Sequence, residues 1–349
     1  MSSSPSPSST RPGTTGTRIR TRRALAAATA VLAATALAAG CASKTEEGGG
    51  GGEKGAGDEF VIGYSQANNA EPYRAQLNKQ LEHYVKDHPN LKLLPIADAQ
   101  QDNAQQVSQI QQFVQQKVDI LIVSPNEPAP VTPAVEQACA AGIPVIILDR
   151  TVDTECYTSF IGGDNREIGK KAGEAVVREL PDGGNVAELR GLLSTEPQKQ
   201  RHDGFMEAIG AHPDIKVVEE REGKWLQPEG TKIMQQWLAR GTDIDLVYAH
   251  NDPMAIGAQQ AAKAAGKDEI TFIGIDGLAI PDGGIRAVQQ ERMAYTYLYP
   301  TGAKEAAQTA ADIAAGKKVE KKQTLGTVEI TKANAEDVYA EYDMNGKVD

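Results

Sequence analysis

From Phe60 onward, short apolar runs alternate with longer stretches in which apolar residues recur at helical spacing. The apolar runs predict two successive series of strands, 60–65, 91–96, 120–123, 145–148 and 158–162, then 185–189, 215–219, 246–249 and 270–275. The stretch 104–117 is typical of the segments between them, since Val107, Ile110 and Phe113 fall on one helical face. Continuously apolar strands separated by helices predict parallel sheets covered on both faces, and two series predict two doubly wound α/β domains.

The C-terminal part predicts three further elements, a strand over 293–299, a helix over 302–315 and a last strand over 326–330. They come too late to start a third domain, so we expect the chain to cross back to the first domain and then return to the second. The expected domains are 59–163 with 299–325, and 164–298 with 326–349. Several crossings would form a multi-segment hinge.

The first 40 residues predict a secretory signal, because four arginines precede an uncharged run of mostly Ala and Leu from Ala24 to Gly40. This run is shorter than the ~20 residues that span a bilayer. The pair Arg22-Arg23 leaves twin-arginine export open beside the general route. The sequence Leu37-Ala38-Ala39-Gly40-Cys41 resembles the bacterial lipobox, which implies lipidation of Cys41; an ordinary signal with a cysteine at its end is the alternative.

Residues 41–58 are polar and contain five consecutive glycines, so we expect a flexible tether between the lipid and the folded domains. The predicted location is therefore outside the cytoplasm, on the outer face of the cell membrane. Export permits a disulfide between Cys139, near the end of a predicted helix, and Cys156, just before a predicted strand, since both would lie at the same edge of a parallel sheet. Two free cysteines are the alternative.

Charge excludes nucleic acid as the partner. Residues 1–40 hold five of the 36 basic residues and no acidic ones, which leaves 31 basic and 47 acidic residues, a net charge of −16. Phosphate binding needs clustered Lys and Arg.

Polar side chains follow apolar strands repeatedly, in both predicted domains. These strand ends are Ser65-Gln66, Asp149-Arg150, His250-Asn251-Asp252 and Asp276-Gly277. One such end is ordinary helix capping, but ligands of open parallel sheets bind beyond the carboxyl ends of the strands. Asp, Asn and Arg can accept or donate paired hydrogen bonds to the adjacent hydroxyls of a sugar. The sequence therefore predicts a sugar site, with Trp225 and Tyr73 as aromatic platforms; Trp225 is otherwise a packing residue.

At these residues the chain resembles the ribose and galactose class of periplasmic sugar-binding proteins, from Phe60 to Tyr339. The likeness rests on the stretches 143–150, 248–257 and 274–277, and Ser65-Gln66 with Tyr73-Arg74 is most similar to galactofuranose-binding members. The resemblance implies a type I fold and hinge closure on a monosaccharide. The site residues it implies, together with the strand-end polar residues, are Ser65, Gln66, Tyr73, Arg74, Asp149, Arg150, Arg201, Trp225, Asn251 and Asp276.

Two departures concern the identity of the sugar. Ala70-Glu71-Pro72-Tyr73 follows Asn69 where ribose binders carry an Asn-Pro-Phe-Phe run, and Tyr73 replaces the Trp of furanose binders. We therefore expect a galactofuranose-like monosaccharide ahead of ribose, with another furanose or pyranose hexose or a pentose as alternatives. Three arginines leave an anionic sugar acid as the alternative to a neutral sugar.

The resemblance also implies the partners, which are the permease subunits of an ABC transporter, with the protein itself a monomer. A sensory receptor that presents its sugar to a signalling partner is the alternative. A sugar-responsive repressor would need a helix-turn-helix where the signal stands. We expect no catalytic residue, cofactor or metal, and we assign His250 to supporting Asn251 and His202 to a solvated helix face.

Overall fold

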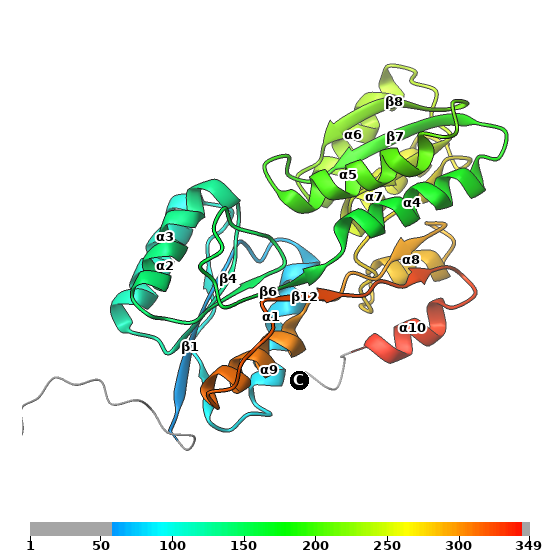
Figure 1. Ribbon diagram of the computed structural model, residues 1–349. Helices are drawn as coiled ribbons and strands as arrows, with labels where there is room; N and C mark the ends of the chain where they lie inside the picture. Colours follow the sequence, from blue (N-terminus) through cyan, green and yellow to red (C-terminus); the bar gives the residue numbers. More distant parts are fainter. Residues whose placement is uncertain (1–57, 344–349) are drawn as a thin grey trace, which may run out of the picture. The chain divides into compact units, whose positions relative to one another are not determined.

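The computed structural model describes residues 58–343, which lie within one compact unit. The predicted signal (1–40), Cys41 and nearly all of the tether (41–58) fall outside the described residues. Among those described, no helix is long and apolar enough to cross a membrane. The predicted α/β class is confirmed, because strands and helices alternate and nearly all strand pairs are parallel (Figure 1).

The first sheet has the order β12-β6-β5-β4-β1-β2, and β3 also pairs with β1. Its strands are β1 (Phe60–Gln66), β2 (Leu91–Leu93), β3 (Ala97–Asp98), β4 (Ile120–Ser124), β5 (Val145–Leu148), β6 (Ser159–Gly163) and β12 (Lys322–Leu325). The helices packed on it are α1 (Pro72–Val85), α2 (Asn103–Gln116), α3 (Pro128–Ala140) and α9 (Ala303–Ala314).

Both faces of this sheet are buried, which explains its continuously apolar strands. In β4, Ile120 and Ile122 belong to the apolar cluster that includes α1 and α9, whereas Leu121 and Val123 belong to the cluster with α2 and α3. This alternation follows from the two-residue period of a strand. Helix α2 begins where the Asp102 carboxylate accepts the Gln105 N–H, as expected of an N-cap.

The second sheet has the order β10-β9-β7-β8. Its strands are β7 (Gly184–Arg190), β8 (Ile215–Glu222), β9 (Leu246–Ala249) and β10 (Thr271–Ile273), followed by β11 (Thr296–Tyr297) and β13 (Glu329–Ile330), which pair antiparallel. Isolated parallel bridges join Ile273 of β10 to Tyr295 and Asp276 to Leu298, on either side of β11. The helices are α4 (Asn165–Glu179), α5 (Glu196–Ile209), α6 (Gln227–Ala239), α7 (Asp252–Ala264), α8 (Gly284–Gln289) and α10 (Ala335–Tyr342).

Three chain segments connect the elements of the two sheets. The first follows β6, the second lies between β11 and α9, and the third between β12 and β13 (Figure 1). We refer below to the elements around the first sheet as the first lobe and those around the second as the second lobe.

Some predicted elements were wrong in extent. The strand expected over 91–96 ends at Leu93, before Pro95, and the strand expected over 293–299 contains only Thr296–Tyr297. The last strand, expected over 326–330, is present as β13. The strand just before it, β12, was not predicted; it is polar and completes the edge of the first sheet by pairing with β6. Edge position explains the miss, because Lys322 is exposed and the strand carries no apolar run.

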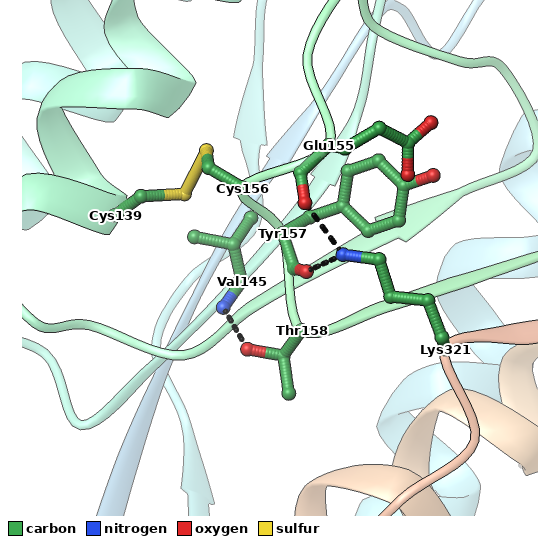
Figure 2. The surroundings of a disulfide bond; sticks show 7 residues. All are labelled: Cys139, Val145, Glu155, Cys156, Tyr157, Thr158 and Lys321. Atoms are coloured by element: carbon green, nitrogen blue, oxygen red, sulfur yellow. Dashed lines mark hydrogen bonds between the residues drawn. A yellow bond between two sulfur atoms is a disulfide. The ribbon is translucent and has the colours of Figure 1, made fainter.

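A disulfide joins Cys139, in the last turn of α3, to Cys156, in the loop between β5 and β6 (Figure 2). The same loop is held on its other side by Lys321, whose Nζ donates to the backbone oxygens of Glu155 and Tyr157. The loop begins at Asp149 and Arg150, so these bonds fix a segment that starts with two predicted site residues.

Candidate ligand-binding site

A small pocket lies beyond the carboxyl ends of strands from both sheets, and its free space is about 20 Å³, room for a single water-sized molecule. Eight of the ten predicted site residues line it together. They are Tyr73, Arg74, Asp149, Arg150, Arg201, Trp225, Asn251 and Asp276. All eight are buried, although most of them are charged or polar.

The other two predicted residues, Ser65 and Gln66, lie behind the pocket rather than on its lining. The Ser65 hydroxyl donates to Gln109 in α2. The Gln66 amide oxygen accepts a hydrogen bond of 2.9 Å from Nη1 of Arg74. Gln66 therefore orients a pocket arginine, and Ser65 contacts a neighbouring helix.

Three lining residues were missed by sequence reasoning, namely Glu71, Pro197 and Tyr299. Tyr299 ends an apolar stretch that was predicted as a strand, so the rule applied to the other strand ends would have found it. Glu71 precedes helix α1, and a lone acidic residue there reads as ordinary capping. Pro197, in the first turn of α5, lines the pocket with an apolar ring that makes no hydrogen bond.

Asp149 is the centre of the charged network in the first lobe. Its carboxylate accepts a bond of 2.6 Å from Nη2 of Arg74 and one of 2.9 Å from the Tyr299 hydroxyl. Burial alone would raise the pKa of Asp149, but Arg74 and Arg150 outweigh it and hold that pKa below its ordinary value. Asp149 is therefore a carboxylate whose ionisation keeps two buried arginines compensated.

The other two arginines are also paired within the protein. Nη1 of Arg150 donates to the Asn126 carbonyl at 2.8 Å, and its Nη2 lies 3.6 Å from Glu71. Nε of Arg201 donates to Asn165 at 2.8 Å. Helix α4 allows this because Gly169 packs against the Arg201 backbone, where a Cβ would stand 2.1 Å from the carbonyl oxygen.

Trp225 forms an aromatic wall over which two arginines stack. The guanidinium carbons of Arg150 and Arg201 lie 5.9 and 5.4 Å from the centre of its ring. Such stacking is attractive and orients the planar guanidinium groups. The Trp225 backbone oxygen accepts a hydrogen bond of 3.0 Å from the side-chain amide of Asn251. Because Asn251 follows β9, the position of Trp225 depends on the end of that strand.

Asp276 differs from the other acids because one of its oxygens, Oδ2, is buried without a hydrogen-bond partner. Neighbouring Asp252 is fully paired, accepting from the Thr296 hydroxyl and the Gly277 N–H. Burial, and then the Asp252 carboxylate, raise the pKa of Asp276 well above its ordinary value. Burial likewise raises the pKa of Asp252 to about 6.

The backbone is strained at three of the lining residues. Asp149, Trp225 and Asp276 have φ values of 71°, 69° and 138°, which side chains other than glycine rarely adopt. Such strain costs of order 1–3 kcal/mol at each residue and clusters at functional sites, where the surrounding structure maintains it.

Two further lining atoms are buried without a hydrogen-bond partner, Nε1 of Trp225 and Nε of Arg74, which lies 3.9 Å from Glu71. Together with Oδ2 of Asp276 they present two donors and one acceptor. Native proteins rarely leave buried polar atoms unpaired. Hydroxyl groups satisfy such a set, since each hydroxyl both donates and accepts.

Residues 62–318 match the family described as periplasmic binding protein domain. The chain is 31% identical to the ribose import binding protein of Bacillus subtilis (strain 168), over 80% of this chain and 90% of that protein. Two solved structures are also similar. The fructose-binding periplasmic domain of a hybrid two-component system has a TM-score of 0.79 at 36% identity, covering 83% of this chain and 98% of that one. A galactofuranose-binding protein has a TM-score of 0.76 at 27% identity, covering 81% and 98%.

The chain therefore belongs to the periplasmic binding protein family, with the type I fold of doubly wound parallel sheets that the resemblance implied. Membership of this family implies a location outside the cytoplasm.

Proposed function

We propose that this protein binds a monosaccharide between its two lobes and delivers it to an ABC-type importer. The observation that carries the proposal is the pocket itself, in which paired arginines and carboxylates surround unpartnered donors and one unpartnered acceptor beside an aromatic wall. Relatives in the same family are named for ribose import and for binding galactofuranose.

A neutral sugar suits the pocket better than an anionic one. Two of the three lining arginines face lining carboxylates, since Arg74 lies 2.6 Å from Asp149 and Arg150 lies 3.6 Å from Glu71. Arg74 is already bound to Asp149, and Arg150 and Arg201 donate to Asn126 and Asn165. An additional carboxylate would therefore compete with existing partners for the arginines.

Hinge motion is the proposed mechanism, since periplasmic binding proteins are among the standard cases of domain closure around a ligand. A sugar that contacts Arg74 and Asp149 from the first lobe and Asp276 and Trp225 from the second stabilises the closed arrangement, because only that arrangement makes both sets of contacts. The three connecting segments are the proposed hinge, with domain boundaries at 163/164, 298/299 and 325/326.

We further propose that Cys41 carries the lipid that anchors the protein to the outer face of the cell membrane, with 41–58 as the tether. Two or more acyl chains give stable anchoring, whereas one is marginal. Replacing Cys41 by Ala should release the exported protein from the membrane fraction. Release of the wild-type protein to the same extent would contradict the anchor.

A sensory receptor is the second candidate, because a similar structure is the fructose-binding domain of a hybrid two-component system. Transport and sensing both use the sugar-bound form, so the site does not separate them. Deletion of the gene in its native cell should abolish uptake of the labelled sugar if the import proposal is right. Retained uptake with a lost transcriptional response would favour the receptor.

The test of sugar binding is a thermal-shift screen of the purified protein with pentoses, hexoses and their sugar acids. We expect stabilisation by neutral hexoses that populate a furanose form, and weaker or no stabilisation by the matching sugar acids. Stabilisation by the acids alone would overturn the neutral-sugar proposal.

A further inference from the structure

Nine acidic, arginine and histidine side chains are buried in the part of the chain that the structure describes. They are Glu71, Arg74, Asp149, Arg150, Glu188, Arg201, His250, Asp252 and Asp276. Six of them line the pocket, and Asp252 is accounted for by its bonds to Thr296 and Gly277. Glu188 and His250 remain, and burying a charge is costly unless it is paired. Their role therefore needs an explanation.

Glu188 lies near the end of β7 with no exposed surface, between two histidines. Its Oε1 is 2.8 Å from Nε2 of His250, and its Oε2 is 2.8 Å from Nδ1 of His202 in α5. Burial opposes ionisation of Glu188, but these two hydrogen bonds outweigh it and lower its pKa to about 2. Glu188 is thus a buried carboxylate that accepts from both rings.

These contacts define the tautomer of His250. Its Nδ1 faces the N–H of Gly191 at 3.4 Å, so this nitrogen accepts, and the ring proton lies on Nε2, toward Glu188. Burial lowers the pKa of His250, which keeps the ring neutral. A carboxylate behind a histidine fixes tautomer and ring orientation in the same way at metal sites.

A cation does not explain this cluster. Ligand atoms of Glu188, His202 and Glu220 lie within 4.8 Å of one another. However, Glu220 is paired with Arg190 at 2.5 Å, and both oxygens of Glu188 accept hydrogen bonds from histidine rings. The charges are compensated by the protein's own groups.

His250 connects this cluster to three lining residues. Its carbonyl oxygen accepts from Nη1 of Arg201, and it directly precedes Asn251. Its ring lies 6.4 Å from the Trp225 ring, centre to centre. Gly191, which donates to His250, packs so closely on Trp225 that a Cβ would stand 2.1 Å from the indole.

We propose that Glu188 is a positioning residue for ligand binding, which holds His250 in one tautomer and orientation and thereby fixes Arg201, Trp225 and Asn251 around the pocket. The proposal rests on the proposed function, because it concerns a ligand in that pocket. Glu188 itself contributes no atom to the pocket lining.

The main test is a comparison of sugar affinity between Glu188→Gln and the wild-type protein by isothermal titration with D-galactose and D-fructose. The amide keeps the volume of the carboxylate, but it also offers a donor, so it no longer selects one tautomer of His250. We expect the dissociation constant to rise on the order of tenfold, which corresponds to about 1.4 kcal/mol.

His202→Asn is the matched control. His202 contacts the same carboxylate from the solvent side and lines no part of the pocket. Both Glu188→Gln and His202→Asn should lose thermal stability, but His202→Asn should keep the dissociation constant for the sugar within about twofold of wild type. If Glu188→Gln likewise lowers stability and leaves affinity within twofold, Glu188 is only structural and the proposal is wrong.

A double-mutant cycle tests whether Glu188 acts through His250. His250→Phe keeps a ring but removes both nitrogens, so Glu188→Gln should weaken binding by less than twofold in that background. If the effects of Glu188→Gln and His250→Phe on the dissociation constant multiply in the double variant, the two residues act independently, because independent sites are additive in free energy. That result would contradict an action of Glu188 through His250.

A measurement without sugar keeps this proposal separate from the proposed function. Nitrogen NMR of the His250 ring should show the Nε2–H tautomer in the free wild-type protein and a changed tautomer population in Glu188→Gln. An unchanged tautomer would overturn the positioning role. Failure of the wild-type protein to bind either sugar would instead contradict sugar binding, whatever the NMR result.

Discussion

Removal of the disulfide by the double variant Cys139→Ser, Cys156→Ser should destabilise the protein chiefly through its unfolded state. The bond closes a loop of 17 residues. In the chain-entropy treatment, releasing a loop of this length costs about 3 kcal/mol at 25 °C. The folded loop keeps other restraints, since Asp153 donates its N–H to Thr132 of α3. Lys321 also donates to the backbone oxygens of Glu155 and Tyr157 (Figure 2). We therefore expect the native arrangement to persist.

The assay is urea unfolding of the double variant and of the oxidised wild-type protein, followed by circular dichroism. The free energy of unfolding should fall by about 3 kcal/mol, and wild-type protein treated with a reductant should approach the variant. A loss below about 1 kcal/mol in the variant would refute the reasoning. It would mean that the loop is held mainly by its other contacts, or that the unfolded chain is already restricted there.

Three further outcomes follow from the site. Asp149→Asn leaves Arg74 buried without its main partner, so urea unfolding should show a loss of about 3 kcal/mol; a loss under about 1 kcal/mol would contradict the central role of Asp149. Gly191→Ala places a Cβ 2.1 Å from the Trp225 ring and should weaken sugar binding by about tenfold or more, and unchanged affinity would contradict the role of this close packing. Burial and the nearby Asp252 raise the pKa of Asp276 well above its ordinary value, and a sugar hydroxyl that donates to Asp276 favours its ionised form, so affinity should rise as pH increases toward that raised pKa and binding should release protons. Titration calorimetry in buffers of different ionisation enthalpy measures that release, and equal proton release by Asp276→Asn would contradict the assignment.

The pattern of the sequence carries much of the fold because the sheets are parallel and covered on both faces. Strands such as β4 and β5 are buried throughout, so their apolar runs mark them clearly. Edge and short strands carry no such signal. Residues 322–325 pair only with β6, and half of their side chains face solvent.

Asp149, Arg150, Asn251 and Asp276 could be predicted from strand ends because parallel strands bring those ends to one edge, whereas Arg74 and Arg201 were predicted from the family resemblance. The rule selects positions but not the direction of each side chain. Ser65 and Gln66 stand at such an end, yet their side chains turn to Gln109 and Arg74. His202 lies on helix α5 and keeps 22% of its side chain exposed, as predicted, but the prediction missed its contact with Glu188, a fully buried carboxylate 14 positions earlier in the chain. Contacts between distant segments of this kind leave no periodic trace in the sequence.

The central claim is that a neutral monosaccharide binds among residues of both lobes. Its most direct test is calorimetric titration of the wild-type protein and of Asp276→Ala with the sugar that gives the largest thermal shift, alongside an unfolding scan of each protein without sugar. We predict one sugar per wild-type chain, and a variant that is folded but neither binds the sugar nor is stabilised by it. Unchanged binding and stabilisation in Asp276→Ala would contradict the claim.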